Sequence, residues 1–376
     1  MTSAEVLSVG AELLLGETVD SNAAFLGAEM ATLGLPLASV RMLPDDRIVV
    51  GQAFAEARAR SSVVLATGGL GPTHDDLTRE GLADALGEEL HEDPRLLAEL
   101  EERFRAFGTM PAANRRQALL MPSAESLPNP IGSAPGWWVE RDGAIVVLMP
   151  GVPSEMRLMW TEQVRPRLAA RFTLPPLAVR SVKAFGIGES AMAERLGSLI
   201  TSPPAGVEVG IYARDDGVHV RFSTRSEASV LDPCADEALA TLGEDAYGTD
   251  DDDLATVALE RLAILGVATL ASWEAGTEGT LLSILAAARP RDVAAKFVGG
   301  VLDVELSSGP PLADAVIQAS LLPQDAGGRS RVRVSLSGSA VLPTTELRIH
   351  GSGQQRLRRA AFAALDAVRR ISSSGR

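Results

Sequence analysis

The order of predicted elements near the N-terminus is the feature that most restricts the fold. Residues 4–9, 35–43 and 62–67 are short apolar runs typical of buried strands, and the intervening segments 21–34 and 47–60 have helical patterns. Strands that alternate with helices predict an α/β fold with a parallel sheet covered on both faces. In such a sheet, ligands bind at the carboxyl ends of the strands.

The third predicted strand runs directly into a glycine-rich loop. Residues 67–78 read Thr-Gly-Gly-Leu-Gly-Pro-Thr-His-Asp-Asp-Leu-Thr. Glycines let backbone N–H groups approach a phosphate, and the N-terminus of the following helix favours an anion. Asp75 and Asp76 cannot bind phosphate themselves, so we expect them to hold a divalent cation that binds the phosphate oxygens. Alternatively, Asp76 caps the helix that follows.

Other polar residues are expected at the same edge of the sheet. They follow the first two predicted strands and a later one over 144–149: Glu12, Gly16, Asp20, Ser21, Asn22, Asp45, Asp46 and the segment 150–155. Asp45, Asp46, Asp75 and Asp76 together would make a metal site of hard oxygen ligands. An isolated Asp is more often a cap or a turn residue, so the convergence of four favours a functional site.

The composition excludes several classes of protein. The chain has a formal net charge of −14, one cysteine (Cys234) and two lysines (Lys183 and Lys296). One cysteine makes neither an internal disulfide nor a Cys-rich zinc site, and a Gly-Lys-Ser/Thr phosphate loop is absent. No run approaches the ~20 apolar residues of a membrane span, and the N-terminus lacks the basic start of a signal peptide. We therefore expect a cytoplasmic protein without membrane contact.

Proline and charge patterns divide the chain into three predicted domains. These domains cover residues 1–170, 171–250 and 254–376. Pro175 and Pro176 mark the first boundary, and the acidic run from Asp250 to Asp253 marks the second. A helix late in the first domain is expected to end near Pro166. The second domain alternates strand-like and helical patterns, which predicts a small α/β domain, and the third is rich in Ala and Leu.

Charge is distributed unevenly along the chain. Residues 326–376 contain ten arginines and two acidic residues, which gives +8 and leaves −22 in the rest. A basic segment is a candidate nucleic-acid surface. Five of these arginines lie along one amphipathic helix pattern with the apolar residues Leu357, Phe362, Leu365 and Val368: Arg356, Arg358, Arg359, Arg369 and Arg370. No interleaved aromatic platform accompanies them, which favours a solvated helix face. We expect no nucleic-acid partner for residues 1–325, and such a partner stays open for the Arg-rich segment alone.

These motifs make the N-terminal domain resemble the MoaB/MogA-like molybdopterin-binding fold as it occurs in the CinA family. The matching segments are Gly10–Gly16, Asp20–Asn22, Asp45–Asp46, the 67–78 loop, Asn114–Ala118, Pro128–Gly136 and Pro150–Met156, followed by Gly188–Ser190 and Tyr247–Gly248. The resemblance implies a three-layer αβα domain with a mostly parallel sheet. It also implies a small KH-like α+β middle domain, a C-terminal α/β domain and a homodimer.

The resemblance further implies a metal-dependent pyrophosphatase that acts on ADP-ribose or a related small-molecule nucleotide. It implies catalytic roles for Asp45, Asp46 and Asp76, and metal ligands at Asp46, Asp75 and Asp76. The implied substrate- and phosphate-binding residues are Glu12, Asn22, Gly68, Gly69, Gly71, Thr73, Gly151 and Ser154. The cation would be Mg, Mn or Co. It would polarise a phosphoanhydride oxygen and activate water.

The third domain departs from the family at its reactive residues. In the CinA family this domain resembles an amidohydrolase of nicotinamide mononucleotide, with the signature Ala-Glu-Ser-Cys-Thr-Gly-Gly and a nucleophilic serine. The corresponding stretch here begins at Trp273, and the nucleophile position is Ala275, which has no atom that can attack a carbonyl. Ser272 takes this role only with a shift of register. We therefore predict a domain that keeps its fold and has lost its deamidase activity.

Two other functions stay open at this point. The same N-terminal pocket would suit a molybdopterin-binding protein of cofactor metabolism, which fold analogy alone supports. A non-enzymatic scaffold linked to competence or DNA damage is the other alternative. Its sequence support is the +8 segment at the C-terminal end.

Overall fold

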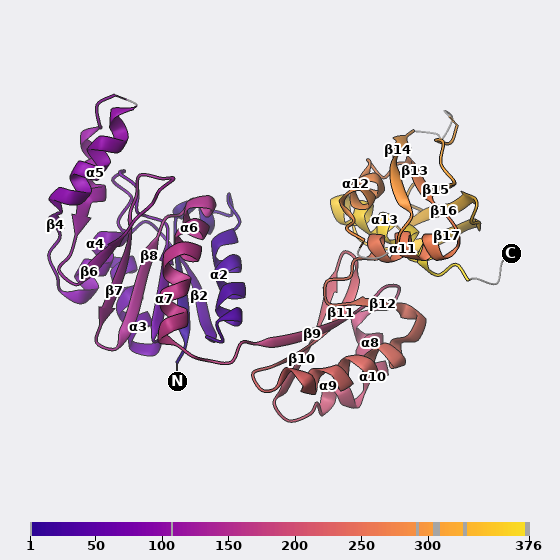
Figure 1. Cartoon of the computed structure of the whole chain (residues 1–376), viewed down its shortest axis with the longest axis horizontal. Coiled ribbons are helices and arrows are strands. Elements are labelled where there is room, and N and C mark those ends of the chain that lie inside the picture. Colours follow the sequence, from indigo (N-terminus) through magenta and orange to yellow (C-terminus); the bar gives the residue numbers. More distant parts are fainter. Residues whose placement is uncertain (1, 107, 291–292, 304–308, 326–328, 373–376) are drawn as a thin grey trace. The chain divides into compact units, whose positions relative to one another are not determined.

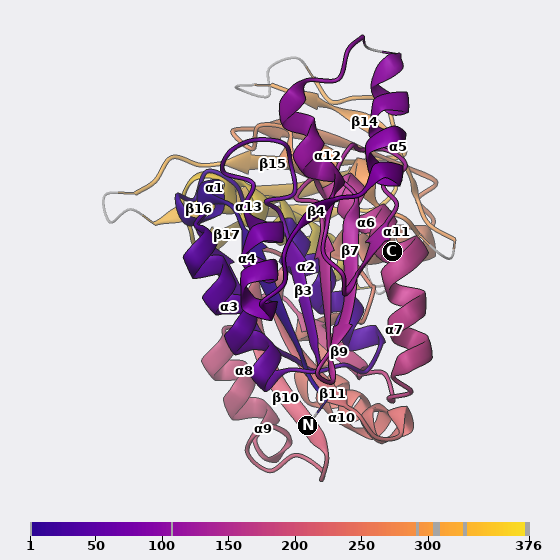
Figure 2. The ribbon, with the colours of Figure 1, turned by 90° about the vertical axis from the view of Figure 1, so that its left-hand side faces the viewer.

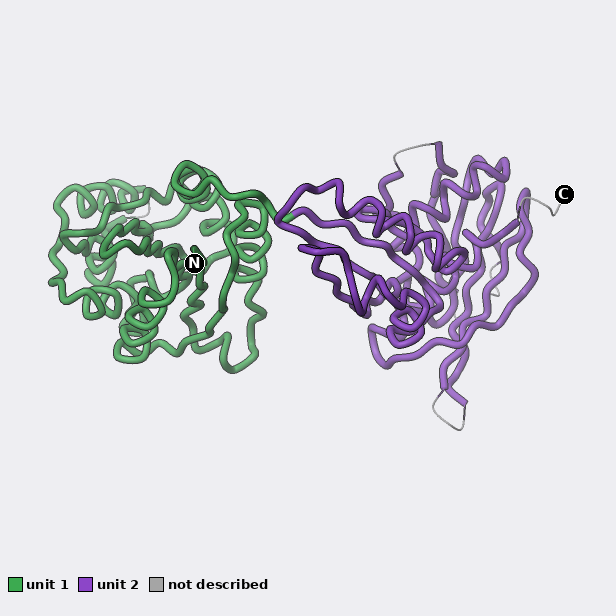
Figure 3. Tube along the Cα trace, turned by 90° about the horizontal axis from the view of Figure 1, so that it is seen from below, with its two compact units in different colours: residues 1–177 green, residues 178–376 purple. Residues whose placement is uncertain are grey.

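The structure is a computed structural model that describes residues 2–106, 108–290, 293–303, 309–325 and 329–372. The chain divides into two compact units, Met1–Leu177 and Ala178–Arg376 (Figure 3). Both units combine helices with sheets (Figure 1), so the predicted α/β class is confirmed. No helix among the described residues is long and apolar enough to cross a membrane.

Unit 1 is built around a six-stranded sheet in the order β2-β1-β3-β8-β7-β6. Its strands are β1 (Ala4–Val9), β2 (Leu37–Leu43), β3 (Val63–Thr67), β6 (Ala124–Leu127), β7 (Gly136–Arg141) and β8 (Ala144–Met149). The four strands β2, β1, β3 and β8 are parallel, and β7 and β6 join antiparallel at one edge. The sheet is therefore mostly parallel, as predicted. A short ladder joins β4 (His91–Glu92) to β5 (Leu119–Leu120).

Helices cover both faces of this sheet, which gives the three layers predicted for the domain (Figure 2). The helices of unit 1 are α1 (Ala11–Leu14), α2 (Ser21–Thr32), α3 (Arg47–Arg60), α4 (Thr78–Leu86), α5 (Pro94–Arg105), the 3-10 helix η1 (Ala112–Ala118), α6 (Pro153–Met159), the π-helical turn η2 (Trp160–Val164) and α7 (Arg165–Arg171). One apolar core joins α2, α6 and α7 to the sheet, and the other joins α3 and α4 to it. Alternating side chains of the buried strands feed the two cores, because successive residues of a strand point to opposite faces.

The helix expected to end near Pro166 continues to Arg171, so that prediction was wrong. The π turn η2 ends at Val164, two residues before Pro166, and shifts the ladder of backbone hydrogen bonds there. Pro166 lies in the first turn of α7, where a missing N–H group is tolerated. Trp160 and Val164 of the π turn are completely buried, so packing against the sheet keeps the chain helical past the proline.

Unit 2 contains two sheets. The first has the antiparallel order β10-β11-β9-β12. Its elements are β9 (Ala178–Ala184), α8 (Glu189–Leu196), α9 (Ser198–Thr201), β10 (Val207–Arg214), β11 (Gly217–Thr224), the 3-10 helix η3 (Ala228–Leu231), α10 (Asp232–Leu242), the 3-10 helix η4 (Gly243–Asp245) and β12 (Ala246–Thr249). Side chains of the helices α8 and α10 pack on this sheet in a separate small core.

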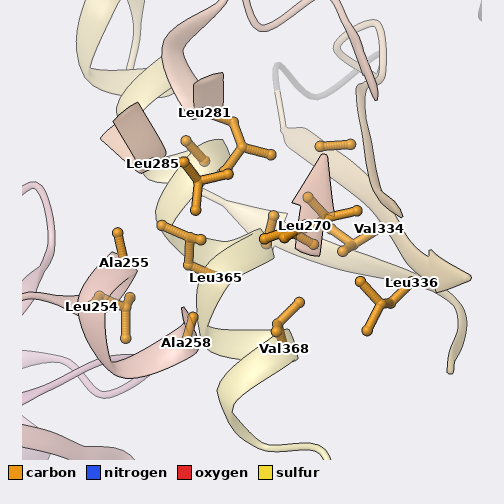
Figure 4. Packing of buried hydrophobic residues seen from close by; sticks show 14 of the residues in the cluster. Leu254, Ala255, Ala258, Leu270, Leu281, Leu285, Val334, Leu336, Leu365 and Val368 are labelled. Atoms are coloured by element: carbon orange, nitrogen blue, oxygen red, sulfur yellow. The ribbon is translucent and has the colours of Figure 1, made fainter. Parts of the chain in front are cut away.

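The second sheet of unit 2 has the order β14-β13-β15-β16-β17. Its elements are α11 (Leu254–Ile264), β13 (Thr269–Ala275), α12 (Thr280–Ala287), β14 (Lys296–Leu302), β15 (Ala315–Leu321), β16 (Ser330–Gly338), β17 (Leu342–Ile349) and α13 (Gly353–Arg369). Strand β13 is parallel to both neighbours, and the pairs from β15 to β17 are antiparallel. Figure 4 shows Leu365 and Val368 of α13 in the core between this sheet and α11 and α12.

Arginines of α13 and its C-cap Arg370 connect this helix to the turn between β10 and β11 and to η4, which adjoin the first sheet of unit 2. Arg358 pairs with Asp215 at 2.9 Å, and Arg370 pairs with Asp245 at 3.1 Å. Arg369 donates to the carbonyl oxygen of Glu244 at 2.9 Å. The expectation that these arginines form only a solvated helix face was therefore wrong. The sequence pattern showed a polar face but not the turn and the 3-10 helix that contact it.

Candidate functional site

Unit 1 has a cavity of about 430 Å³ at the carboxyl ends of its parallel strands. The lining comes from the end of β1, the glycine-rich loop after β3 and the loop between β8 and α6, together with Asp45, Gln117, Ser133 and Ala134. The predicted site residues Glu12, Asp45, Gly68, Gly69, Gly71, Thr73, Asp75, Asp76 and Gly151 all belong to this lining. The parallel topology thus brings loops that are far apart in sequence to one place.

Asp76 holds the glycine-rich loop in shape. Its Oδ1 accepts a hydrogen bond from the N–H of Gly71 at 2.7 Å. Its Oδ2 accepts from the N–H of Thr73 at 2.8 Å and from the Thr73 hydroxyl at 2.5 Å. The next helix, α4, starts at Thr78 with Leu77 at its N-cap and without a side-chain cap. Asp76 therefore organises the loop and does not cap the helix.

Close packing explains why this loop needs glycine. A Cβ atom on Gly68 would lie 2.1 Å from the carbonyl oxygen of Val9, and one on Gly69 would lie 2.1 Å from the Thr78 hydroxyl. Both glycines have a positive φ, +93° and +64°, which other residues adopt only with strain. The N–H groups of Gly68, Gly71 and Thr73 are already bonded within the protein. These glycines permit a close approach of the backbone, and the N–H groups of Gly68 and Gly71 are not donors left for a ligand.

Asp45 is a cavity carboxylate whose surroundings oppose its negative charge. It accepts a hydrogen bond from the N–H of Ala11 at 2.8 Å. Burial raises the pKa of Asp45 above its usual range, and the negative charges of Glu12, Asp75 and Asp76 raise it further. These three acids are therefore close enough to Asp45 to disfavour its negative charge. A cation among them would relieve this repulsion.

Three predicted site residues lie outside the cavity lining. The carboxylate of Asp46 accepts from the N–H groups of Ile48 at 2.9 Å and Val49 at 3.0 Å, so it caps α3. Asn22 is buried and donates to the carbonyl oxygen of Gly151 at 2.8 Å, which supports the loop from behind. Ser154 is exposed in the first turn of α6, and its neighbour Glu155 lines the cavity in its place.

Two arginines that were not predicted as site residues support the loop. Arg79 is almost fully buried and donates to the carbonyl oxygens of Leu70 at 2.8 Å and Pro135 at 3.0 Å. Burial lowers the pKa of Arg79 to about 10, so the guanidinium keeps its charge at neutral pH. Arg116 donates to the carbonyl oxygens of Thr73 and Asp76 and to Glu80. Arg116 belongs to a segment that carried the family resemblance, which was the available signal.

The donor atoms of the cavity suit a hard divalent cation, but they do not form a protein cage. Among the described residues, no group of three or more His, Cys, Asp or Glu side chains is arranged to hold a metal ion. Asp46 caps α3 and both oxygens of Asp76 are bonded within the loop, whereas Asp45 accepts from Ala11 through Oδ2 alone. Asp45, Glu12 and Asp75 are therefore the better candidates. Mg²⁺ is commonly held by one or two carboxylates together with water and substrate phosphates. The residues present fit that mode, and the cation stays a prediction.

The third domain places its signature residues in the core. Glu274, at the end of β13, is 1% exposed and accepts from the N–H groups of Leu281 at 3.1 Å and Leu282 at 2.7 Å. It also accepts from the hydroxyls of Thr277 at 2.8 Å and Ser272 at 3.2 Å. Ser272 is completely buried, so water and substrate do not reach its hydroxyl. A role of Ser272 as a nucleophile therefore lacks structural support.

The chain carries domains of two recognised classes. Residues 5–170 match the family described as "Probable molybdopterin binding domain", which fits the sheet and cavity of unit 1. Residues 179–248 match the "Damage-inducible protein CinA KH domain", which corresponds to the first sheet of unit 2.

The sequences of related proteins align with most of the chain. CinA-like proteins of Thermomicrobium roseum and Deinococcus deserti are 45% and 44% identical over 289 and 298 residues. These matches span 75% and 76% of this chain and 70% and 71% of those proteins. The chain therefore belongs to the CinA-like family.

Solved structures similar to the chain align with less than half of it. CinA of Thermoplasma acidophilum is 35% identical, with coverage of 44% of this chain and 97% of that one and a TM-score of 0.42. The tungsten cofactor synthesizing protein MoaB of Pyrococcus furiosus is 16% identical, with coverage of 45% and 96% and a TM-score of 0.29.

Proposed function

We propose that unit 1 is a metal-dependent pyrophosphatase that hydrolyses ADP-ribose or a related nucleoside diphosphate compound. The observation that carries the proposal is the set of Asp45, Glu12 and Asp75 in one cavity beside the glycine-rich loop. Burial raises the pKa of Asp45, and the negative charges of Glu12, Asp75 and Asp76 raise it further. An anionic diphosphate enters such a cavity only together with a cation, so the cavity suits a metal-bound substrate better than a free anion.

The chain's own residues would divide the work between binding and loop support. Asp45, with Glu12 or Asp75, would hold the cation. When bound, the cation polarises a phosphoanhydride oxygen and lowers the pKa of water. Gly68 and Gly69 allow the tight packing against Val9 and Thr78 that holds this loop at the cavity. Asp76 is a positioning residue that fixes the conformation of the loop, because both of its oxygens are bonded to the loop itself.

AMP release from ADP-ribose, with and without added Mg, Mn or Co, tests this proposal. Asp45→Asn keeps an acceptor for the Ala11 N–H but removes the charge, and we expect activity to fall by about 100-fold or more. Ser154→Ala, exposed and outside the cavity, is the matched control and should behave as wild type. Metal-independent turnover, or full activity in Asp45→Asn, would contradict the proposal.

Molybdopterin binding is the second candidate function of the same cavity. Its support is the match of residues 5–170 to a molybdopterin-binding domain family. Calorimetric titration of the full chain with molybdopterin separates the two functions. Tight binding without hydrolysis of ADP-ribose would favour the second candidate.

The C-terminal domain is proposed to be a deamidase-like domain without turnover. The nucleophile position is Ala275, and the nearby Ser272 hydroxyl is buried and bonded to Glu274. We expect no ammonia release from nicotinamide mononucleotide above background. Robust turnover that is lost in Ser272→Ala would overturn this proposal.

The homodimer implied by the family resemblance is also a proposal. It concerns the whole chain in solution, and light scattering after size-exclusion chromatography measures it directly. A monomer at micromolar concentration would contradict it.

A further inference from the structure

Unit 2 contains a cavity of about 430 Å³ that plays no part in the proposed pyrophosphatase. It lies where the first sheet of unit 2 meets the C-terminal sheet. The loop from Phe185 to Glu189 and the turn between β10 and β11 line one side, and the end of β17 and Arg359 of α13 line the other. A cavity of this size falls within the range of small-molecule sites.

The cavity collects arginines that other residues do not neutralise. Arg214, Arg348 and Arg359 line it together with His350. Within the described part of the chain, these three guanidinium groups form no ion pair and donate no hydrogen bond. Other arginines of the same segment behave differently, since Arg331 pairs with Glu346 on the neighbouring strand at 2.8 Å.

Two carboxylates also line the cavity, and both have partners. Asp215 pairs with Arg358 at 2.9 Å. Glu189 accepts a hydrogen bond from the N–H of Ala213 at 3.2 Å. Because the Ala213 amide is neutral, Glu189 keeps its charge, and the lining has three unpaired arginines against this one carboxylate. This excess of positive charge stands out because residues 178–253 around it contain 15 acidic and 6 basic residues.

Backbone geometry adds a second attraction for an anion. Helix α8 begins at Glu189 after Gly188, and its first turn has no side-chain cap. The first N–H groups of a helix lack intrahelical partners and favour negative charge. A Cβ atom on Gly188 would meet no atom within 4 Å, so the approach to this helix end is open.

We propose that this cavity binds a small phosphorylated molecule through its phosphate monoester group. Arg348 and Arg359 supply charge-assisted hydrogen bonds to the phosphate oxygens from one side, and the start of α8 contributes from the other. Ile187 and Val218 form an apolar wall for the rest of the molecule. A polynucleotide suits the region poorly, because the surrounding acidic segment would repel its backbone.

Isothermal titration of the full chain with AMP, ribose 5-phosphate and inorganic phosphate tests the proposal. The double variant Arg348→Gln/Arg359→Gln should bind the preferred probe about tenfold more weakly or worse. Arg331→Gln is the control: it removes one positive charge outside the cavity and should leave the affinity unchanged. Preference for AMP or ribose 5-phosphate over inorganic phosphate identifies an organic ligand, and similar affinities identify free phosphate as the source.

Gly188→Val gives a second test without a change of charge. Gly188 has φ of −88°, which valine adopts without strain, and its side chain would cover the start of α8. We expect the same loss of binding with an unchanged melting temperature. Unchanged affinity in the double variant, no binding of any probe, or tighter binding of a single-stranded oligonucleotide than of AMP would each overturn the proposal.

Discussion

Two strand–loop–helix joints in this chain use a carboxylate in opposite ways. At the joint from β3 to α4, Asp76 bonds to its own loop and leaves Asp45 and Glu12 facing a cavity. At the joint from β13 to α12, Glu274 is buried and bonds to the start of the helix. The first carboxylate shapes an open site, and the second fills the space where a site would be. A carboxylate at a strand–loop–helix joint can therefore either shape an open cavity or fill the core.

Removal of the buried carboxylate should have the largest effect on stability. Glu274→Ala leaves the N–H groups of Leu281 and Leu282 without their acceptor in the core. We expect unit 2 to lose about 3 kcal/mol or more of unfolding free energy. Hydrogen exchange measures this unit separately from unit 1. Glu278→Gln, on the exposed part of the same loop, is the control. A cost below 1 kcal/mol would break the contrast between the two joints.

The loop carboxylate should matter less for stability and more for function. Asp76→Asn keeps one acceptor but replaces the oxygen that accepts from the Thr73 N–H and hydroxyl. We expect unit 1 to lose about 1–2 kcal/mol, because the loop is near the surface. The proposed release of AMP should fall well beyond what this loss of stability explains. Chemical denaturation and the activity assay together check both parts, and full activity would place the loop outside the mechanism.

A third carboxylate, that of Asp216, tests whether burial or hydrogen-bond partners have the larger effect on the pKa of an acid in this chain. Burial opposes ionisation of Asp216, but hydrogen bonds with His219 and Tyr247 outweigh it and lower its pKa to about 2. A lowered pKa contributes stability above the unfolded-state value, which is lost as the pH falls from about 4 through 2. We expect about 1–2 kcal/mol from this group.

Acid titration of unit 2 stability, with Asp216→Asn as the comparison, measures this contribution. The variant should lack the part of the pH dependence that falls between about pH 4 and 2. Identical acid profiles for the two proteins would show that Asp216 is not held by its partners.

The smallest effect is expected at the loop between β13 and α12. Glu278 has a φ of +53°, in the region that favours glycine. Glu278→Gly should relieve this strain and stabilise unit 2 by up to about 1 kcal/mol, partly offset by the greater freedom of glycine in the unfolded chain. A thermal melt compared with Glu278→Ala checks it. Destabilisation by glycine would mean that the loop has adapted to its present sequence.

Local patterns in the sequence predicted most of the elements of unit 1. The helix expected over 47–60 is α3 (Arg47–Arg60), and the strand expected over 62–67 is β3 (Val63–Thr67). Hydrophobic periodicity and turn residues act over a few residues, so they are visible in one dimension. The prediction that the helix ends near Pro166 was wrong, because buried contacts between the π turn and the sheet keep the chain helical past this proline.

Adjacent residues show where prediction from the sequence reached its limit at the site. Asp45 and Asp46 were both predicted as catalytic acids, and Asp46 also as a metal ligand, yet Asp45 lines the cavity and Asp46 caps α3. Which of the two faces the cavity depends on where β2 ends and on the direction in which α3 starts. Likewise, the glycines of the loop were predicted from phosphate chemistry, whereas contacts with Val9 and Thr78 also require them.

The sequence by itself determined the alternation of strands and helices, the edge of the sheet where the loops meet and the absence of a nucleophilic side chain at position 275. Each of these depends on residue type or on short-range periodicity. Only the tertiary structure decided which carboxylates are free in the cavity, that Ser272 is buried, and that arginines of α13 and its C-cap connect this helix to η4 and to the turn between β10 and β11. Those outcomes depend on contacts between residues that are distant in the chain, and hydrogen-bond partners and burial exist only once the chain has packed.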